Sequence, residues 1–154
     1  MSSRSALTRH AKLPEPLKRW VHQCSGGRWY GDDVAEFAVV IPTYRRPHLL
    51  AATVESVLRQ TYPASEIVVV RDGPDAAVPE SLRTGTVRVI DRPKEGVAAA
   101  RNAGTAATHA AWLCFLDDDD LWHPDRLLVT AKYLDSHPDC AAVQADWWSL
   151  RSGA

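Results

Sequence analysis

The sequence lacks an excess of basic residues and a long hydrophobic run. Its 154 residues carry a formal net charge of −1, with 18 Lys and Arg against 19 Asp and Glu. A chain with this balance has no extended basic field, so we expect it not to bind nucleic acid. Its longest apolar stretches are strand-sized, well short of the roughly 20 residues of a membrane-spanning helix, and its N-terminus has no apolar signal-peptide core. We therefore expect no transmembrane segment and a cytoplasmic location.

The sequence also lacks a metal-binding pattern of cysteines. Cys24, Cys114 and Cys140 have none of the paired spacings of zinc sites, and two of them lie in apolar runs where a reduced cysteine packs as a small hydrophobic side chain. We assign these cysteines no chemistry. A chain of this length that is 45% hydrophobic is long enough for one domain with a core and too short for two ordinary ones.

The chain divides into two parts. Residues 1–36 contain several prolines and glycines and no sustained apolar period, which predicts a partly irregular N-terminal leader. From Phe37 onward, short apolar runs alternate with helical patterns, which predicts one domain over residues 37–154. The expected strands are residues 37–41, 66–70, 86–90, 111–116 and 140–145. The expected helices follow Pro47, Gly96 and Pro124.

The alternation of strands and helices predicts an α/β fold. Near-continuous apolar strands separated by helices indicate an open, mostly parallel sheet with helices on both faces. The first and the last helix are each expected to bury one face. The inward residues of the first helix are Leu49, Leu50, Thr53, Val54, Val57 and Leu58. Those of the last helix are Leu127, Leu128, Ala131 and Leu134. In such folds, ligands bind beyond the carboxyl ends of the strands.

Four consecutive carboxylates, Asp117 to Asp120, follow the apolar run at residues 110–116. Like charges this close repel one another, so the cluster must be solvated, protonated or neutralised by a cation. Mg²⁺ is often held by one or two carboxylates together with substrate phosphates. The cluster therefore favours a phosphate-bearing ligand, although an acidic loop in water, with one Asp at the start of the next helix, explains the run equally well.

Five segments in a fixed order point to a family. They are VVIPTYRRPHLL, ESVLRQTYP, IVVVRDG, EGVAAARNAG and FLDDDDLWHPDRL. Together they resemble the family 2 glycosyltransferases from about Phe37 to Asp146. The resemblance implies the nucleotide-sugar-binding half of a GT-A fold, which is Rossmann-like, and implies that the domain is truncated at its C-terminus.

The resemblance assigns nucleoside contacts to Pro42, Thr43 and Tyr44, and the base contact to Asp72. The Tyr44 ring offers stacking or a hydrogen bond, but ordinary packing explains it too, and Arg46 is a candidate for phosphate contact. The carboxylate of Asp72 suits a base N–H, but an Asp followed by a Gly also suits a simple turn.

The family usually has a second acid where this chain has Arg71, so the local charge balance departs from the family pattern. Arg101 matches the family's arginine on the helix after Gly96. It is expected either to contact phosphate or to form a structural ion pair with the acidic cluster.

The acidic run corresponds to the family's Asp-x-Asp (DXD) motif, which holds a divalent metal, Mg²⁺ or Mn²⁺, at the diphosphate. Alignment of LWHPD makes Asp117 and Asp119 the motif acids and metal ligands. Asp118 is then expected to contact ribose or sugar, and Asp120 to lie at the entry of the next helix.

The resemblance implies an inverting, metal-dependent glycosyltransferase that moves sugar from a nucleotide-diphosphate sugar to the hydroxyl of an acceptor that the sequence does not identify. The general base is expected beyond Ala154, so no catalytic residue is assigned, and the role is not given to Asp146. An alternative is a non-catalytic nucleotide-binding or interaction module that lacks the acceptor half. A receiver-like phosphoacceptor domain is disfavoured by the motif order and by the absence of a lysine after the fifth expected strand.

Overall fold

The computed structural model describes residues 35–74, 78–79, 82 and 85–145. The predicted leader lies outside the described residues except for its last two positions, and Asp146 lies outside them as well. None of the helices in the described part is long and apolar enough to cross a membrane.

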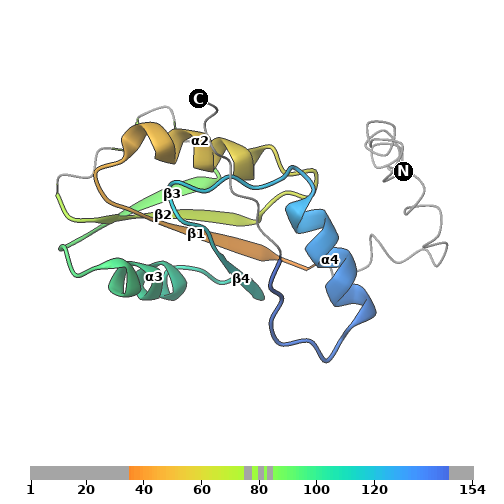
Figure 1. Ribbon diagram of the computed structural model, residues 1–154. Coiled ribbons are helices and arrows are strands. Elements are labelled where there is room, and N and C mark those ends of the chain that lie inside the picture. The colour runs from red at the N-terminus through yellow and green to blue at the C-terminus, as the bar shows by residue number, and fades with distance from the viewer. Residues whose placement is uncertain (1–34, 75–77, 80–81, 83–84, 146–154) are drawn as a thin grey trace, which may run out of the picture. The chain divides into compact units, whose positions relative to one another are not determined.

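The core of the domain is a four-stranded sheet in which every neighbouring pair of strands is parallel (Figure 1). Its strands are β1 (Phe37–Thr43), β2 (Glu66–Asp72), β3 (Val87–Arg92) and β4 (Trp112–Phe115), in the order β3-β2-β1-β4. All seven residues of β1 are buried, because β1 lies inside the sheet and is covered on both faces. The predicted open α/β fold is confirmed.

The predicted fifth strand is wrong. Residues 140–145 form neither helix nor strand. Ala141, Ala142 and Ala145 are exposed, so the segment has little apolar side-chain surface with which to offset the entropy of ordering a strand. Strand formation in such a run depends on a pairing partner and not on the run itself.

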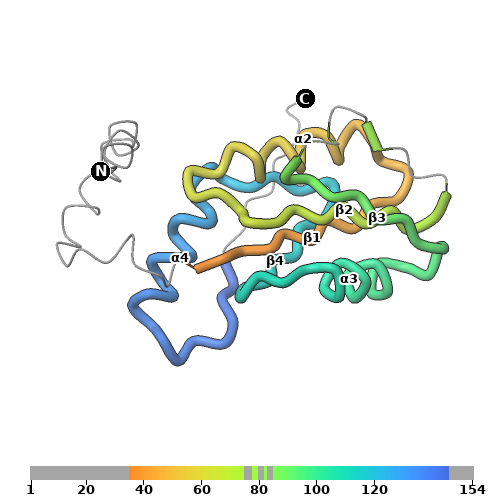
Figure 2. The backbone as a smooth tube through the Cα atoms, turned by 180° about the vertical axis from the view of Figure 1, so that it is seen from behind, coloured from red at the N-terminus to blue at the C-terminus, as the bar shows by residue number. Residues whose placement is uncertain are grey.

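Helices α2 (Pro47–Leu58) and α4 (Arg126–Ser136) pack on one face of the sheet, and α3 (Val97–Ala106) covers the other (Figures 1 and 2). Pro47 starts α2, as predicted. The inward faces are narrower than predicted, because Leu49 and Leu58 are 38% and 46% exposed. In α4, Leu128 is only half-buried. The buried residues of the two helices are Leu50, Thr53, Val54 and Val57, and Leu127, Thr130, Ala131 and Leu134.

Helix α3 lies close against the sheet at Gly104. A Cβ on Gly104 would overlap one methyl group of Val40 and come within 3.0 Å of the other. It would also lie 3.1 Å from a methyl group of Val70. Only a residue without a side chain fits this contact, which places α3 firmly against β1 and β2.

Candidate functional site

The sheet has a topological switch point at β1. The chain passes from β1 to β2 and β3 on one side, then crosses by way of α3 to β4 on the other side. Connections therefore diverge beyond the carboxyl ends of β1 and β4, where open α/β sheets bind ligands.

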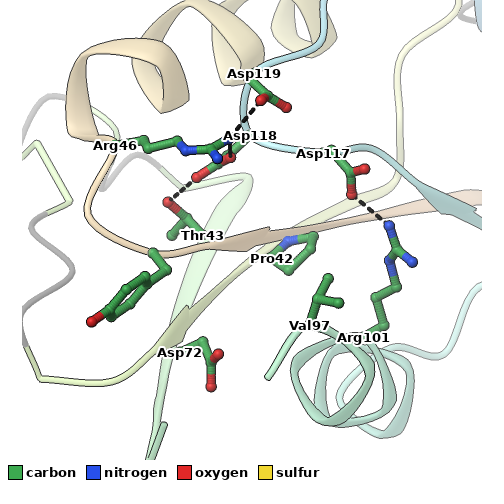
Figure 3. A pocket seen from close by; sticks show the side chains of 10 residues that line it. Pro42, Thr43, Arg46, Asp72, Val97, Arg101, Asp117, Asp118 and Asp119 are labelled. Atoms are coloured by element: carbon green, nitrogen blue, oxygen red, sulfur yellow. Dashed lines mark hydrogen bonds and ion pairs between the residues drawn. The ribbon is translucent and has the colours of Figure 1, made fainter. Parts of the chain in front are cut away.

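A cavity of about 500 Å³ opens near this switch point (Figure 3). All nine residues that the sequence predicted for donor or metal contact line it. They come from strand ends, loops and one helix that lie far apart in the sequence: Pro42, Thr43, Tyr44, Arg46, Asp72, Arg101, Asp117, Asp118 and Asp119. The tenth lining residue, Val97, was not predicted. It is 51% exposed at the start of α3 and gives the cavity an apolar wall.

Asp118 is the buried member of the acidic cluster. It is 6% exposed, and the hydroxyl of Thr43 donates to one of its carboxylate oxygens over 2.7 Å. Nη1 of Arg46 lies 3.5 Å from the other oxygen. The pair of Thr43 and Asp118 ties the end of β1 to the chain after β4, so Asp118 serves the structure of the site whatever else it contacts.

The outer two carboxylates that face the cavity are each paired with an arginine. Nη1 of Arg46 lies 2.5 Å from an oxygen of Asp119, and Nη2 of Arg101 lies 2.5 Å from an oxygen of Asp117. Figure 3 shows the two guanidinium groups approaching the acidic run from different elements. In this structure the two arginines supply positive charge that neutralises part of the acidic run. The pair with Asp117 matches one of the two roles predicted for Arg101, and its contact with phosphate stays a prediction.

Thr53 on α2 and Gln60, just after α2, hold the acidic loop and the chain that follows it in place. The hydroxyl of Thr53 lies 3.0 Å from the main-chain oxygen of Asp118 and 2.9 Å from that of Asp120. Gln60 donates to the main-chain oxygen of His123 over 2.8 Å and accepts the N–H of Leu127 over 2.9 Å. The sequence signal for these tethers is weak, since it consists of one polar residue on the apolar face of α2 and another just past the end of that helix.

Asp120 does not lie at a helix entry, so that prediction is wrong. Helix α4 begins at Arg126, after Asp125. Asp120 lies instead in a turn, where its N–H donates to the main-chain oxygen of Asp117 over 3.1 Å. Partial burial raises the pKa of Asp120, and the negative charges of Asp119 and Asp117 raise it further.

The carboxylate of Asp72 fixes the start of α3. Asp72 is 7% exposed and accepts the N–H of Glu95 over 2.8 Å and that of Gly96 over 3.0 Å. Gly96 has a φ of 94°, a conformation that favours glycine. A carboxylate has about four lone-pair positions, so these contacts leave Asp72 able to accept another N–H from the cavity. Its contact with a base stays a prediction.

The half-buried ring of Tyr44 is flanked by two cations. The ammonium of Lys94 lies 4.2 Å from the ring centre and 3.0 Å from the hydroxyl. The guanidinium carbon of Arg45 lies 5.1 Å from the same centre, and Arg45 has a φ of 56°. Lys94 was missed at the sequence level, because it belongs to a different loop and only the fold brings it to Tyr44.

The departure at Arg71 does not reach the cavity. Successive residues of a strand point to opposite faces, and Asp72 is the one that lines the cavity. Arg71 pairs instead with Asp91 on β3, with a distance of 3.0 Å between Nη1 and the carboxylate, and donates to the main-chain oxygen of Pro74 over 3.1 Å. Its charge is therefore balanced away from the cavity.

Comparison with known families decides the assignment. The model of "Glycosyl transferase family 2" matches residues 38–152, most of the chain. The chain belongs to glycosyl transferase family 2. An uncharacterized glycosyltransferase of Rickettsia bellii is 30% identical over 107 residues, which cover 67% of this chain and 16% of that protein. The amylovoran biosynthesis glycosyltransferase AmsB of Erwinia amylovora is 32% identical over 99 residues, covering 59% of this chain and 33% of that protein.

A solved glycosyltransferase-like fold is also similar to this chain. A fragment of S. aureus TarS in complex with UDP-GlcNAc superposes with a TM-score of 0.58 at 23% identity, covering 67% of this chain and 32% of that one. The likeness confirms the predicted GT-A architecture. The chain thus spans a third or less of the length of these relatives.

Proposed function

We propose that this chain is the donor-binding part of a glycosyltransferase that uses a nucleotide-diphosphate sugar. The observation that carries the proposal is the shared cavity: nine residues, selected by family resemblance, line one hollow at the switch point of the sheet. UDP-GlcNAc in the TarS complex supports a nucleotide sugar as donor. A cytoplasmic location stays a prediction.

The nucleoside would lie on the side of the cavity formed by Tyr44 and Asp72. Tyr44 presents an aromatic face whose position Lys94 supports from the neighbouring loop. Asp72 presents an acceptor that selects for a base N–H, because a site built to accept a hydrogen bond discriminates against a base that has none to donate. Pro42 and Thr43 would close this side as the exit of β1.

The diphosphate would lie between Arg46 and Arg101, which enter the cavity from the β1–α2 connection and from α3. Guanidinium groups bind phosphate oxygens with paired N–H donors. The two arginines therefore bracket a position next to the acidic run. Asp118 is held by Thr43 at the same place, where contact with ribose or sugar is possible through its second oxygen.

The donor set fits a divalent metal that also binds phosphate. The described residues contain no group of three or more His, Cys, Asp or Glu side chains that could hold an ion by themselves. Asp117 and Asp119 offer carboxylate oxygens as ligands, and their side chains are 49% and 47% exposed. Mg²⁺ is commonly bound by one or two carboxylates and completed by phosphates and water. When bound, such an ion would act as a Lewis acid that stabilises the charge on the departing diphosphate.

The reaction would be a displacement at the anomeric carbon with inversion. The acceptor hydroxyl forms the new C–O bond, the bond to the diphosphate breaks, and the hydroxyl proton passes to a general base. We assign no described residue to that base. The acceptor is equally unassigned, since none of the lining residues requires one acceptor chemistry.

Isothermal titration calorimetry with UDP, with and without Mn²⁺, tests the proposal. The wild-type chain should bind UDP more tightly with Mn²⁺ than without it. Asp119→Ala should reduce this ratio of UDP affinities at least about tenfold, since it removes a charged ligand of the metal. Asp135→Ala, which removes an exposed carboxylate from α4, is the matched control. UDP binding that is independent of Mn²⁺ and unaffected by Asp119→Ala would refute the site assignment.

A non-catalytic nucleotide-binding or interaction module is the second candidate. It differs in outcome: UDP binds, and a panel of UDP-sugars gives neither transfer nor hydrolysis. Measuring by chromatography whether UDP is released from the UDP-sugars distinguishes the two functions.

A further inference from the structure

The carboxylates expected to face a metal already have cationic partners. Asp119 pairs with Arg46 and Asp117 pairs with Arg101, each over 2.5 Å. These are the same two arginines that face the cavity where the diphosphate would lie. Each arginine therefore has two competing anions within its reach, one in the protein and one in the ligand.

The charge of the cavity makes either ligand unfavourable alone. Its lining holds two arginines and four aspartates, a formal charge of −2. A diphosphate entering alone adds negative charge to negative charge, and a cation entering alone must displace a guanidinium from the carboxylate it would bind. Together the two ligands avoid both costs.

Arg46 is free to move without disturbing the fold. Its side chain is 51% exposed and that of Asp119 is 47% exposed. The buried Asp118, which Arg46 also approaches at 3.5 Å, keeps the shorter hydrogen bond of 2.7 Å from Thr43. Departure of Arg46 would leave Asp119 accessible and Asp118 still bonded.

Arg101 has unused hydrogen-bonding capacity. Its Nε is buried and has no hydrogen-bond partner among the described residues. The guanidinium lies over the ring of Phe115, 5.8 Å from its centre, while Nη2 contacts Asp117. A buried donor without a partner is unfavourable. A multivalent anion in the cavity would offer acceptors to this donor, which would favour a different side-chain conformation of Arg101.

We propose that Arg46 and Arg101 form an exchangeable interlock that couples donor binding to metal binding, an inference that rests on the proposed function. Without donor, the guanidinium groups occupy Asp119 and Asp117. When the diphosphate enters, they transfer to its oxygens and leave the carboxylates open to a divalent cation. Because coupling is reciprocal, the cation favours donor binding by the same factor as the donor favours the cation.

The expected size follows from the exposure of the ion pairs. Half-exposed pairs of this kind contribute little, so each arginine should weaken cation binding by roughly two- to fivefold in the absence of nucleotide. With nucleotide bound, the same arginine should have almost no effect on the cation. The two pairs together should supply a coupling of up to roughly 25-fold, within the common range for linked sites.

Four titrations measure the interlock. Mn²⁺ binding is followed by electron paramagnetic resonance of free Mn²⁺, with and without saturating UDP, in the wild type and in Arg46→Gln. We expect Arg46→Gln to bind Mn²⁺ roughly two- to fivefold more tightly when UDP is absent. Its affinity for Mn²⁺ in the presence of saturating UDP should be nearly unchanged. The coupling factor should therefore fall by the same two- to fivefold. Arg59→Gln removes an arginine that pairs with Glu55 on α2 outside the cavity, and it should change neither affinity.

The results that would refute the interlock differ from the result that would refute the proposed function. If Arg46→Gln tightens Mn²⁺ binding equally with and without UDP, Arg46 acts as a fixed charge and the interlock is refuted. Weaker or unchanged binding of Mn²⁺ alone refutes it as well. Arg101→Gln should give the same pattern through Asp117, so a folding defect in one variant, seen by circular dichroism, leaves the other to decide. Failure of the wild type to bind UDP at any Mn²⁺ concentration would instead refute the proposed function.

Discussion

Replacing Thr43 by valine tests how the site is joined to the sheet. Thr43 is 3% exposed, and its hydroxyl donates over 2.7 Å to Asp118, which is 6% exposed. Valine has nearly the same shape and no hydroxyl, so the buried carboxylate loses a donor and gains no space for water. The distant contact from Arg46 at 3.5 Å replaces little of that loss.

The expected cost is about 1.5–3 kcal/mol of unfolding free energy, the usual worth of a hydrogen bond to a charged group. For a domain of this size that corresponds to a fall in Tm of roughly 3–12 °C. Thr61→Val is the matched control, because Thr61 donates to Asp125 over 2.8 Å but is exposed. Water replaces the lost donor there, so the control should stay within about 0.5 kcal/mol of the wild type. Urea denaturation followed by tryptophan fluorescence measures both.

A double-mutant cycle assigns the loss to the pair. In an Asp118→Ala background, Thr43→Val should cost much less than in the wild type, since the acceptor is gone. A loss for Thr43→Val no larger than that for Thr61→Val, or an equal loss in both backgrounds, would refute the reasoning that Asp118 depends on this hydroxyl.

Three further predictions concern other parts of the domain. Gly104→Ala should lower stability by up to about 2 kcal/mol, because overlap with Val40 outweighs the better helix propensity of alanine. A higher free energy of unfolding for this variant, measured by urea denaturation, would contradict the close contact of α3. Asp120→Asn should raise stability at about pH 7 and have no effect at about pH 3. The pKa of Asp120 is raised in the folded state, so the folded state binds more protons and the wild type loses stability as pH rises through that pKa; Tm at several pH values measures this, and an equal gain at both pH values would contradict it. Arg71→Ala should leave UDP affinity within about twofold and cost no more than about 1 kcal/mol, since its pair with Asp91 is partly exposed and lies away from the cavity; a large loss of UDP affinity in calorimetry would place Arg71 at the ligand.

Much of the fold could be predicted from local patterns. The two central strands, β1 and β2, are almost wholly buried and contain the apolar runs that are typical of a covered parallel sheet. The helices between the strands carry apolar faces of period 3.6. Polar residues at the strand ends then had to meet at one edge, which is why separate motifs around Thr43, Asp72 and Asp117 came together in one cavity.

The rest depended on contacts between distant residues. The run at residues 140–145 has strand-like composition but forms no strand, because pairing is a property of two segments and not of one. The acidic loop and the chain after it are held by Thr53 on α2 and by Gln60 just after that helix, so local capping preferences misplaced Asp120. Lys94 reaches Tyr44 only through the fold. Charge pairing between arginines and aspartates was visible as a possibility, but the partners were not.

The most direct test of the account is a crystal structure of the chain with UDP and Mn²⁺, using anomalous scattering to locate manganese. The account predicts a manganese peak in the cavity within bonding distance of a carboxylate oxygen of Asp117 or Asp119 and of the diphosphate, with the base beside Tyr44 and Asp72. Manganese elsewhere, or UDP bound outside the cavity, would contradict it.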